Sequence, residues 1–574
     1  MSKRIVIIGG VALGPKAANR LKRLDPTAEV IMIDEKTNIS FGGCGIPYYV
    51  SGEINSLDAL RSTNYGTVRT PEYFKERKDV TVLNRTKVLS IDRSSRTIRI
   101  KDLRTDKESV LPYDRLVLGT GSTPKVPPIE GRDLKGVGGA NSLEEAEALR
   151  SACASGKINN AVVIGGGFIG MEIAVALADM WGIKTSVVEF MPQVMPGVLS
   201  ANLSDMVAND LRSNNVDVYV SEKVQRLEGE DGVVKRVITD KRTLDADLVI
   251  FATGYAPNTE LARAAGLELQ ERTGAILVNK YMQTSDPLIY AGGDCVATPN
   301  LITGKPFVLA LGSLANRQGR VIGTNLASES GQVATFAGAV GTWCVKLFKM
   351  SACGTGLTLE RAKSEGFDAV SVCVEQLDRA HFYPEKFMMT LELVVDRPTR
   401  RILGIQGFCE AGDALKARID AVATMLQFGH PTIDDLSNAE VAYAPPFAAA
   451  MDVLNVAANT ADNLLSGQLK AISSREFSDL WKNRDKNNVY FADARPAAAA
   501  KATAAKYPDE WHAVPLEEVQ DCLDTLPRDR QIALICNTGL RSYEVALYLN
   551  GKGITNVVNA LGGMQSQIKR GESY

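Results

Sequence analysis

Runs of consecutive apolar residues that end in glycine turns recur in the N-terminal half of this chain. The first run, Ile5–Ile8, is apolar at every position, as in a parallel strand buried on both faces. The turn Gly9–Gly14 follows it, a helical pattern then reaches Leu24, and a second apolar run occupies residues 29–33. This order of strand, turn, helix and strand predicts a Rossmann-like βαβ unit.

The glycine turn of this unit departs from the usual dinucleotide fingerprint. Val11 stands where G-x-G-x-x-G has its middle glycine, so a βαβ unit that binds no nucleotide is the alternative reading of the turn taken alone. The second strand ends at Asp34-Glu35, where an acidic side chain can accept a hydrogen bond from a ribose hydroxyl, while the helix N-terminus receives the pyrophosphate. The expected nucleotide contacts are Gly9, Gly10, Gly14 and Glu35.

A second βαβ pattern carries the complete fingerprint. The apolar run Ala161–Ile164 leads into Gly165, Gly167 and Gly170 at G-x-G-x-x-G spacing, and the next strand ends at Glu189. A carboxylate at that point accepts hydrogen bonds from a free ribose 2′-OH and repels a 2′-phosphate. This unit therefore predicts a site for NADH in preference to NADPH.

Composition narrows the function classes. The chain has 574 residues, which predicts three or four domains, and 65 basic against 67 acidic residues, which gives no electrostatic reason to expect nucleic acid or an anionic membrane. The apolar stretch at the start of the chain is too short for a signal peptide or a membrane span. The nine cysteines lack the dense spacing of a disulfide scaffold. We expect a cytoplasmic protein with reduced thiols, no metal and no membrane span.

Three further segments give the two βαβ units a context. Leu118–Gly121 and Phe251–Gly254 each close a strand at glycine, and Ile289–Asp294 places a carboxylate after a strand. This order resembles the FAD- and pyridine nucleotide-dependent disulfide reductase superfamily. The resemblance implies that the first unit holds FAD, that the inserted second unit holds NADH, and that further cofactor contacts come from Thr120, Gly121, Gly254 and Asp294.

A single cysteine lies where this superfamily places its redox-active thiol. Cys44 stands in Ser40–Tyr49, and Tyr49 occupies the position where glutathione and lipoamide reductases carry a second cysteine. Cys44 must then work as a thiolate, a sulfenate or a mixed disulfide with a small thiol. Pro47 is compatible with a helix start, so we expect a helix dipole to lower the pKa of the Cys44 thiol.

The same stretch resembles coenzyme A-disulfide reductases and their NADH-dependent persulfide reductase relatives. That resemblance implies that Ser40 and nearby basic side chains bind coenzyme A, with Arg20, Arg23 and Lys78 at the matching positions. Each of these cations by itself is more often a solvated surface charge. The segment 335–455 resembles the dimerisation domain of the superfamily, which implies a homodimer in which Tyr383 and Tyr443 reach the partner's active site.

A different βα pattern begins near the C-terminus. The apolar run Gln531–Ile535 leads into Cys536, Arg541 closes a C-x-x-x-x-R loop, and a helical pattern follows over residues 542–549. The pattern resembles the rhodanese sulfurtransferase domain, in which loop N–H groups stabilise an anionic thiolate or persulfide. A phosphatase loop of similar shape and a catalytically idle rhodanese fold are the alternatives. Asp493 and Arg495 are expected to brace the loop.

These elements predict an α/β protein with two Rossmann-like nucleotide-binding domains, an α+β dimerisation domain and a C-terminal α/β rhodanese domain. The expected domains are FAD-binding (1–125 and 255–330), NADH-binding (126–254), dimerisation (331–456), a linker or connecting helix (457–470) and rhodanese (471–574).

The resemblance implies an NADH-dependent flavoprotein that reduces CoA persulfide, polysulfide or CoA disulfide at Cys44, with Cys536 carrying sulfane sulfur. The sequence leaves the acceptor open among these small molecules. It also leaves open whether Cys536 donates sulfur to the Cys44 site or accepts it, and whether CoA stays bound. A water-forming NADH oxidase and a flavin redox sensor or sulfur-relay protein are the alternative functions.

Overall fold

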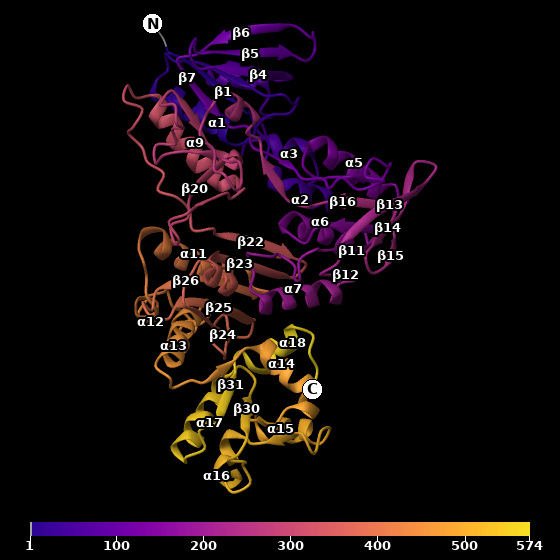
Figure 1. Cartoon of the computed structure of the whole chain (residues 1–574), viewed down its shortest axis with the longest axis vertical. Helices are drawn as coiled ribbons and strands as arrows, with labels where there is room; N and C mark the ends of the chain where they lie inside the picture. Colours follow the sequence, from indigo (N-terminus) through magenta and orange to yellow (C-terminus); the bar gives the residue numbers. More distant parts are fainter. Residues whose placement is uncertain (1–2) are drawn as a thin grey trace. The chain divides into compact units, whose positions relative to one another are not determined.

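The computed structural model describes residues 3–574, and the chain divides into two compact units. The first unit comprises the residues up to Val188 together with Glu222–Ala339. The second comprises Glu189–Ser221 together with Val340–Tyr574. Each unit combines sheets with helices, and Figure 1 labels the elements along the chain.

A parallel sheet of five strands organises the N-terminal part of the first unit. Its order is β19-β7-β1-β2-β3, so the first strand lies in the middle, where its apolar run is buried on both faces. The strands are β1 (Arg4–Ile8), β2 (Glu29–Ile33), β3 (Thr81–Leu83), β7 (Arg115–Leu118) and β19 (Ile289–Ala291).

Helix α1 (Leu13–Leu24) packs against α9 (Gly312–Leu326), although the two are far apart in sequence. The backbones approach closely at two glycines of α9. A Cβ on Gly319 would lie 2.8 Å from the carbonyl oxygen of Leu13, and one on Gly323 would lie 2.5 Å from that of Ala17. These glycines therefore fix the distance between the helices and hold the N-terminus of α9 over the edge of the sheet where β1 ends.

A second parallel sheet contains the neighbouring strands β11-β10-β16-β9. They are β9 (Val137–Gly138), β10 (Asn160–Ile164), β11 (Lys184–Val188) and β16 (Leu248–Phe251), with α5 (Leu143–Ala154) and α6 (Phe168–Asp179) beside them. The first unit also contains antiparallel sheets formed by β4 (Thr86–Asp92), β5 (Thr97–Asp102) and β6 (Glu108–Pro112), and by β13 (Val224–Glu230), β14 (Val233–Thr239) and β15 (Thr243–Asp245).

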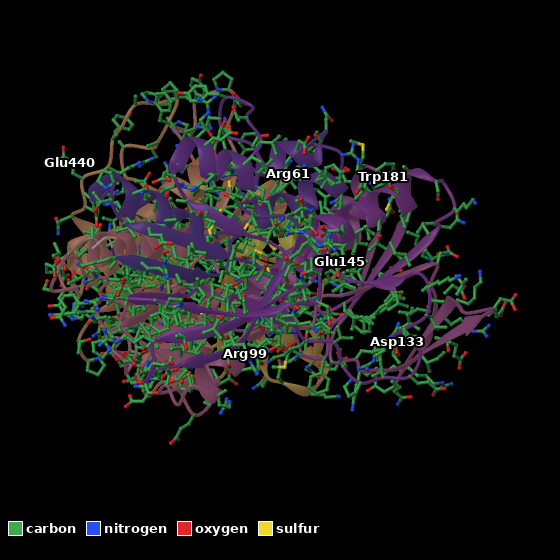
Figure 2. All side chains as sticks on the ribbon, turned by 90° about the horizontal axis from the view of Figure 1, so that it is seen from above. Arg61, Arg99, Asp133, Glu145, Trp181 and Glu440 are labelled. Carbon is green, nitrogen blue, oxygen red and sulfur yellow. The ribbon has the colours of Figure 1, made fainter. Side chains whose placement is uncertain are left out.

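Short helical turns carry the segment that contains Cys44. They are η1 (Gly43–Gly45), α2 (Ile46–Val50), α3 (Leu57–Arg61) and α4 (Pro71–Lys78). The indole of Trp181, labelled in Figure 2, donates a hydrogen bond to the carbonyl of Val50 at 2.8 Å. Because Trp181 follows α6, this bond ties the end of α2 to the second Rossmann-like region.

An antiparallel sheet in the order β22-β23-β26-β25-β24 forms the central part of the second unit. Its strands are β22 (Trp343–Leu347), β23 (Met350–Gly356), β24 (Ala369–Leu377), β25 (Met388–Asp396) and β26 (Ile402–Cys409). The helices α7 (Ala201–Ser213), α10 (Leu359–Ser364), α11 (Gly412–Phe428), α12 (Ile433–Ser437) and α13 (Val453–Leu465) accompany it. The expected connecting segment is largely helical, and Ala457, Ala458 and Ala461 of α13 are fully buried.

The C-terminal part of this unit is a parallel sheet in the order β27-β31-β30-β28-β29. The strands are β27 (Ala471–Ile472), β28 (Val489–Asp493), β29 (Trp511–Ala513), β30 (Gln531–Ile535) and β31 (Val557–Ala560). The helices are α14 (Ser474–Lys482), α15 (Ala497–Ala504), α16 (Val519–Cys522), α17 (Leu540–Gly551) and α18 (Gly563–Lys569).

The two parts of the second unit share an apolar contact. Cys373 of β24 clusters with Leu469 and Leu561, which flank the C-terminal sheet. None of the described helices is both long enough and apolar enough to span a membrane.

Candidate active site

The turn between β1 and α1 is packed so closely at two positions that only glycine fits there. Gly9 has φ +112°, and a Cβ there would lie 2.0 Å from the carbonyl oxygen of Gly119. A Cβ on Gly14 would lie 2.0 Å from the carbonyl oxygen of Gly9. The first turn of α1 is thereby held against the end of β1, where its N–H groups can receive a pyrophosphate.

The carboxylate beside this turn belongs to Asp34. Its Oδ2 accepts the backbone N–H of Gly10 at 2.7 Å, and burial raises the pKa of this carboxyl. Glu35, the residue expected to bind the ribose, is instead exposed and pairs with Lys87 at 3.3 Å. The sequence offers two adjacent acidic residues at the end of this strand, and Asp34 is the one that contacts Gly10.

The sulfur of Cys44 faces the N-terminus of α9. A Cβ built on Gly312, the first residue of α9, would lie 3.8 Å from the Cys44 Sγ, and the Gly312 backbone N–H hydrogen-bonds to the thiol. Cys44 itself is exposed and lies in η1, directly before α2. The helix that meets the sulfur is therefore the 15-residue α9 and not the five-residue α2.

The expected lowering of the Cys44 pKa is wrong. Burial of part of the thiol raises its pKa, the carboxylates of Glu172 and Asp294 add to this effect, and the Gly312 N–H opposes it. A helix as short as α2 contributes little dipole to offset these effects. In the protein alone, Cys44 is held as a thiol more than an unperturbed cysteine would be.

Tyr255 is a neighbour of this thiol that sequence reasoning missed. Burial, together with the charges of Asp294, Glu145 and Cys44, raises the pKa of Tyr255 to about 12. Its hydroxyl donates a hydrogen bond to Asn141. Tyr255 is thus a neutral phenol near the sulfur, and Asn141 accepts its one O–H proton. Its position directly after Gly254 was the available signal.

Asp294 and the strand-closing glycines lie around a two-stranded ribbon. The Ser122 hydroxyl donates to Asp294 at 3.0 Å, and burial raises the pKa of Asp294. Thr120 donates to the carbonyl of Asn258 at 2.6 Å. The turns at Gly121 (φ +68°) and Gly254 (φ +90°) flank β8 (Ser122–Pro124) and β17 (Tyr255–Pro257), which pair with each other.

The second glycine turn repeats the packing of the first. A Cβ on Gly165 would lie 2.3 Å from the carbonyl oxygen of Ala252, and one on Gly170 would lie 2.0 Å from that of Gly165. A Cβ on Gly167, which caps α6, would meet open space within 4 Å. The turn therefore combines a close-packed base with an open face, the shape that a pyrophosphate requires.

Glu189 directly follows β11 in the sequence and is 7% exposed. Its Oε1 accepts the backbone N–H of Met191 at 2.7 Å, so the carboxylate is held in place by its own loop. The side chains of Phe190 and Met191 are both exposed.

The four residues expected to bind coenzyme A have different surroundings. Ser40 is buried with φ +49°, and its N–H donates to the carbonyl of Gly10 at 2.8 Å. Arg20 donates to Thr324 at 3.0 Å, Lys78 stands 5.6 Å from the ring centroid of Tyr73, and Arg23 is exposed. The backbone of Ser40 thus contacts the first glycine turn, while Arg20 and Arg23 lie on α1 and Lys78 lies on α4.

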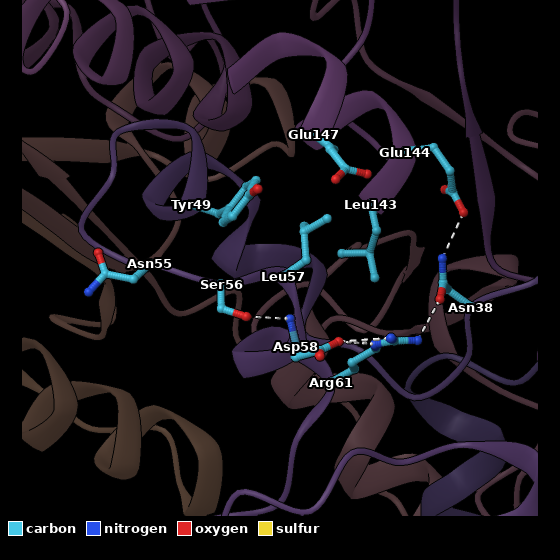
Figure 3. Close-up of a pocket in the computed structure, with 10 residues that line it drawn as sticks. All are labelled: Asn38, Tyr49, Asn55, Ser56, Leu57, Asp58, Arg61, Leu143, Glu144 and Glu147. Carbon is cyan, nitrogen blue, oxygen red and sulfur yellow. Dashed lines mark hydrogen bonds and ion pairs between the residues drawn. The ribbon is translucent and has the colours of Figure 1, made fainter. Parts of the chain in front are cut away.

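A hollow of about 460 Å³ opens beside α3 and α5 (Figure 3). Among the described residues that line it, the one cation is Arg61, which pairs with Asp58 at 2.8 Å and donates to Asn38 at 2.8 Å. The carboxylates of Glu144 and Glu147 also line it, and Cys44 is not among its lining residues. An anionic polyphosphate is poorly matched to this hollow, since its carboxylates outnumber an arginine that is already paired.

The second unit brings together the loops that carry Tyr383 and Tyr443. The backbone N–H of Ala380 donates to the carbonyl of Pro445 at 3.3 Å, and Arg379 lies 5.9 Å from the ring centroid of Tyr383. Tyr443 is 53% exposed. The neighbouring apolar side chains that are also exposed are Phe382, Phe447 and Met451.

The loop after β30 wraps the sulfur of Cys536. Cys536 is 1% exposed, and its Sγ accepts hydrogen bonds from the Gly539 N–H at 3.2 Å and the Ser542 hydroxyl at 3.3 Å. Gly539 caps the 12-residue α17, so the positive end of that helix points at the sulfur. Arg541 lies in the first turn of α17 and is half-buried.

Asp493 ends β28 and is the register partner of Ile535, the residue before Cys536. The carboxylate is fully buried, pairs with Arg495 at 2.6 Å and accepts the indole N–H of Trp511 at 3.0 Å. These contacts use both carboxylate oxygens within the protein, and the bracing role expected for Asp493 and Arg495 stays a prediction.

Comparison with known proteins decides the family. A family model described as pyridine nucleotide-disulphide oxidoreductase matches residues 3–319, and a model of the dimerisation domain of the same family matches residues 344–454. The chain belongs to the pyridine nucleotide-disulphide oxidoreductase family. Members of this family depend on FAD and a nicotinamide cofactor, so the predicted enzyme class and these two cofactors are confirmed.

Relatives that align with about four-fifths of this chain include both sulfur reductases and an NADH oxidase. The chain is 36% identical to the NAD(P)H coenzyme A polysulfide/persulfide reductase of Pyrococcus horikoshii over 458 residues, which is 80% of this chain and 98% of that protein. It is 33% identical to the NADH oxidase of Methanocaldococcus jannaschii over 465 residues, which is 81% of this chain and all of that protein.

Two solved structures extend over the C-terminal part as well. An NAD-dependent persulfide reductase from A. fulgidus aligns with a TM-score of 0.90 at 38% identity and covers 98% of this chain and 99% of its own. Reduced Bacillus anthracis CoADR-RHD aligns with a TM-score of 0.89 at 30% identity, with 99% and 98% covered. The predicted fold class is confirmed by these similarities.

Proposed function

We propose that the protein is an NADH-dependent flavoprotein reductase that cleaves the sulfur–sulfur bond of CoA persulfide, polysulfide or CoA disulfide at Cys44. The observation that carries this proposal is the single thiol. Tyr49 fills the place of a second cysteine, is 8% exposed, and lies under the guanidinium of Arg150 at 4.5 Å. Cys44 therefore has to exchange with the sulfur of a substrate.

The glycine turns and carboxylates fit the two nucleotides. We assign the FAD adenosine end to Gly9, Gly10, Gly14 and Asp34, which replaces Glu35 as the ribose ligand, and the flavin end to Thr120, Gly121, Gly254 and Asp294. We assign NADH to Gly165, Gly167, Gly170 and Glu189, whose carboxylate disfavours a 2′-phosphate. Bound FAD supplies the two-electron link between the nicotinamide and the thiol.

The step at Cys44 follows from thiol–disulfide chemistry. The Cys44 thiolate attacks the CoA-bound sulfur of CoA–S–SH, the S–S bond breaks, and hydrosulfide leaves, so that Cys44 and CoA form a mixed disulfide. Two electrons that originate in NADH, together with a proton, cleave that disulfide to CoA thiol and the Cys44 thiolate. The N–H of Gly312 stabilises the thiolate, and Tyr255 lies near it as a neutral phenol.

We also propose that residues 471–574 form a rhodanese domain that carries sulfane sulfur on Cys536. The N–H of Gly539, the Ser542 hydroxyl and the N-terminus of α17 support an anionic sulfur in that loop. Arg541 would add positive charge. CoA is long enough that a sulfur atom bound to it could reach both Cys44 and Cys536, which a single side chain could not bridge.

The domain boundaries expected from the sequence remain part of this proposal, and so does the homodimer. The match to a dimerisation-domain model supports a dimer, and the exposed tyrosine Tyr443 with its apolar neighbours supports an interface at those loops. Tyr383 and Tyr443 would then act at the partner subunit's site. The cations Arg20, Arg23 and Lys78 remain candidates for the CoA phosphates.

The test is steady-state sulfide release from CoA persulfide with NADH under anaerobic conditions. Cys44→Ser should abolish release at equal FAD content. Cys536→Ser should slow the use of polysulfide while leaving CoA disulfide reduction intact, and the half-buried Cys522→Ser should change neither rate. Unchanged polysulfide-dependent NADH turnover in Cys536→Ser would remove the shuttle from the proposal.

A water-forming NADH oxidase is the second candidate, and the similarity to the Methanocaldococcus jannaschii NADH oxidase favours it. In that case Cys44 would cycle as a sulfenate. Rapid NADH consumption with O2 as sole acceptor, faster than with any sulfur compound, would support this function.

A further inference from the structure

A pair of cysteines lies in the antiparallel sheet of the second unit. Cys344 of β22 is the register partner of Cys353 of β23. Directly opposite residues of an antiparallel pair point to the same face, with Cβ atoms about 4.5 to 5.5 Å apart. That spacing is close to the distance of a disulfide, so a small adjustment suffices to join the two sulfurs.

The two thiols differ in access. β22 is the edge strand of its sheet, and Cys344 is exposed there, whereas Cys353 is 2% exposed. Helix α11 packs on β23 (Figure 1). This helix brings the ion pair of Lys416 and Asp420 within electrostatic range of both sulfurs. A solvent-borne reagent can therefore reach only one thiol of the pair.

The charges around the pair favour a thiolate on the accessible cysteine. A hydrogen bond with the Cys353 thiol lowers the pKa of Cys344 well below its usual range, and Lys416 adds to this effect while burial and Asp420 oppose it. The same hydrogen bond and burial raise the pKa of Cys353. Lys346, two residues along β22, is a further exposed cation on the same side of the strand.

We propose that Cys344 and Cys353 form a second redox-active dithiol, which small-molecule disulfides oxidise to a cross-strand disulfide. An accessible low-pKa thiol with a resolving cysteine beside it is the arrangement that such exchange requires. The site lies outside the machinery assigned to Cys44 and Cys536 and does not rest on the proposed function.

The reaction has two exchange steps. The Cys344 thiolate attacks one sulfur of a disulfide RS–SR, forms a mixed disulfide Cys344–S–S–R and expels RS⁻, which takes a proton. The Cys353 thiol then loses its proton to solvent, attacks the Cys344 sulfur and expels the second RS⁻. The sum is oxidation of two protein thiols and reduction of RS–SR to two RSH.

Mass spectrometry of the whole protein tests this directly. The reduced, FAD-loaded protein is incubated anaerobically with glutathione disulfide, alkylated and digested with trypsin. Because Lys346 and Lys349 separate the cysteines, oxidation should link peptide 321–346 to peptide 350–361 with the loss of two hydrogens. Recovery of Cys344 as a free thiol, or only as a glutathione adduct, would overturn the proposal.

Single variants separate the two roles. In Cys353→Ala, the reaction with glutathione disulfide should stop at the glutathione adduct on Cys344. Alkylation of Cys344 by iodoacetamide at pH 7 should slow by about tenfold in this variant, because the hydrogen bond that lowers the Cys344 pKa is lost. Cys344→Ala should leave Cys353 unmodified because it is buried. Cys522→Ala, which removes a half-buried thiol whose pKa burial raises, should leave the linked peptides unchanged. Equal alkylation rates of Cys344 with and without Cys353 would contradict the role of Cys353.

Discussion

The Nζ of Lys569 donates to the carboxylate of Glu375 at 2.7 Å and joins the last helix of the chain to the sheet of the dimerisation domain. Lys569 ends α18, and Glu375 lies in β24 with a fully buried side chain. The same ammonium donates to the Thr390 hydroxyl at 2.7 Å and to the Met388 carbonyl at 3.0 Å. All three of its hydrogen bonds therefore hold the C-terminal domain in place.

Lys569→Met should lower the free energy of unfolding by about 3 to 5 kcal/mol, because it leaves the Glu375 carboxylate buried without its cation. Urea-induced unfolding measures the loss. The matched control is Lys482→Met, which breaks the 2.6 Å pair with Glu572 at the surface and should cost about 1 kcal/mol or less. Equal losses in the two variants would show that the Lys569 contact does not hold the domains together.

Gly563→Ala should disturb the Cys536 loop. Gly563 has φ +55°, and a Cβ there would lie 2.4 Å from the carbonyl oxygen of Cys536. Gly553 also has a positive φ, +79°, but a Cβ there would meet open space, so Gly553→Ala controls for backbone strain alone. Sulfur transfer from thiosulfate to cyanide should fall by about tenfold or more in Gly563→Ala. A similar loss in Gly553→Ala would argue against the steric account.

Glu392 should make the protein less stable as the pH rises from about 4.5 to about 7. Burial raises the pKa of this carboxyl from 4.5 to about 7, with opposing hydrogen bonds from Ser200 and other side chains. In that window the folded state holds a proton that the unfolded chain has released, so the free energy of unfolding falls with pH, by about 3 kcal/mol in total.

Glu392→Gln should reduce the slope by the contribution of Glu392, which thermal unfolding at a series of pH values will measure. Glu228→Gln is the control, because ion pairs with Arg226 and Arg236 lower the pKa of Glu228 and move its titration below the window. An undiminished slope in Glu392→Gln would assign the titration to another group.

Glu172→Gln should make Cys44 react faster with iodoacetamide at neutral pH. After burial, the Glu172 carboxylate is the largest influence that raises the pKa of the Cys44 thiol, so its neutralisation increases the thiolate fraction. Alkylation rates across pH, followed by mass spectrometry of the Cys44 peptide, check this. Glu147→Gln, at the hollow beside α5, should leave the rate unchanged.

The sequence predicted those parts of the site that depend on local backbone geometry. The tight turns at Gly9 and Gly165 were predictable because such a turn after a buried strand admits only glycine, and the strand and the turn are adjacent in the sequence. Cys536 was found for a similar reason, since its loop and the helix that supports it are consecutive in the chain.

The environment of Cys44 could not be predicted in the same way. Gly312, Glu172 and Tyr255 come from three different parts of the chain and meet the thiol only in the folded structure. The sequence therefore led to the wrong helix and to the wrong direction of the pKa shift. The choice between Asp34 and Glu35 depends on a shift of one residue. The point at which β2 ends decides which of the two carboxylates turns toward Gly10.

The central claim is that flavin electrons reach sulfur through Cys44. Anaerobic stopped-flow mixing of the NADH-reduced protein with CoA persulfide, CoA disulfide, polysulfide or O2 tests it, in the wild type and in Cys44→Ser. The account predicts fast reoxidation of the wild type by at least one sulfur compound, slow reoxidation by O2, and a Cys44→Ser variant that NADH still reduces but sulfur compounds do not reoxidise. Reoxidation of Cys44→Ser by those compounds at the wild-type rate would contradict it.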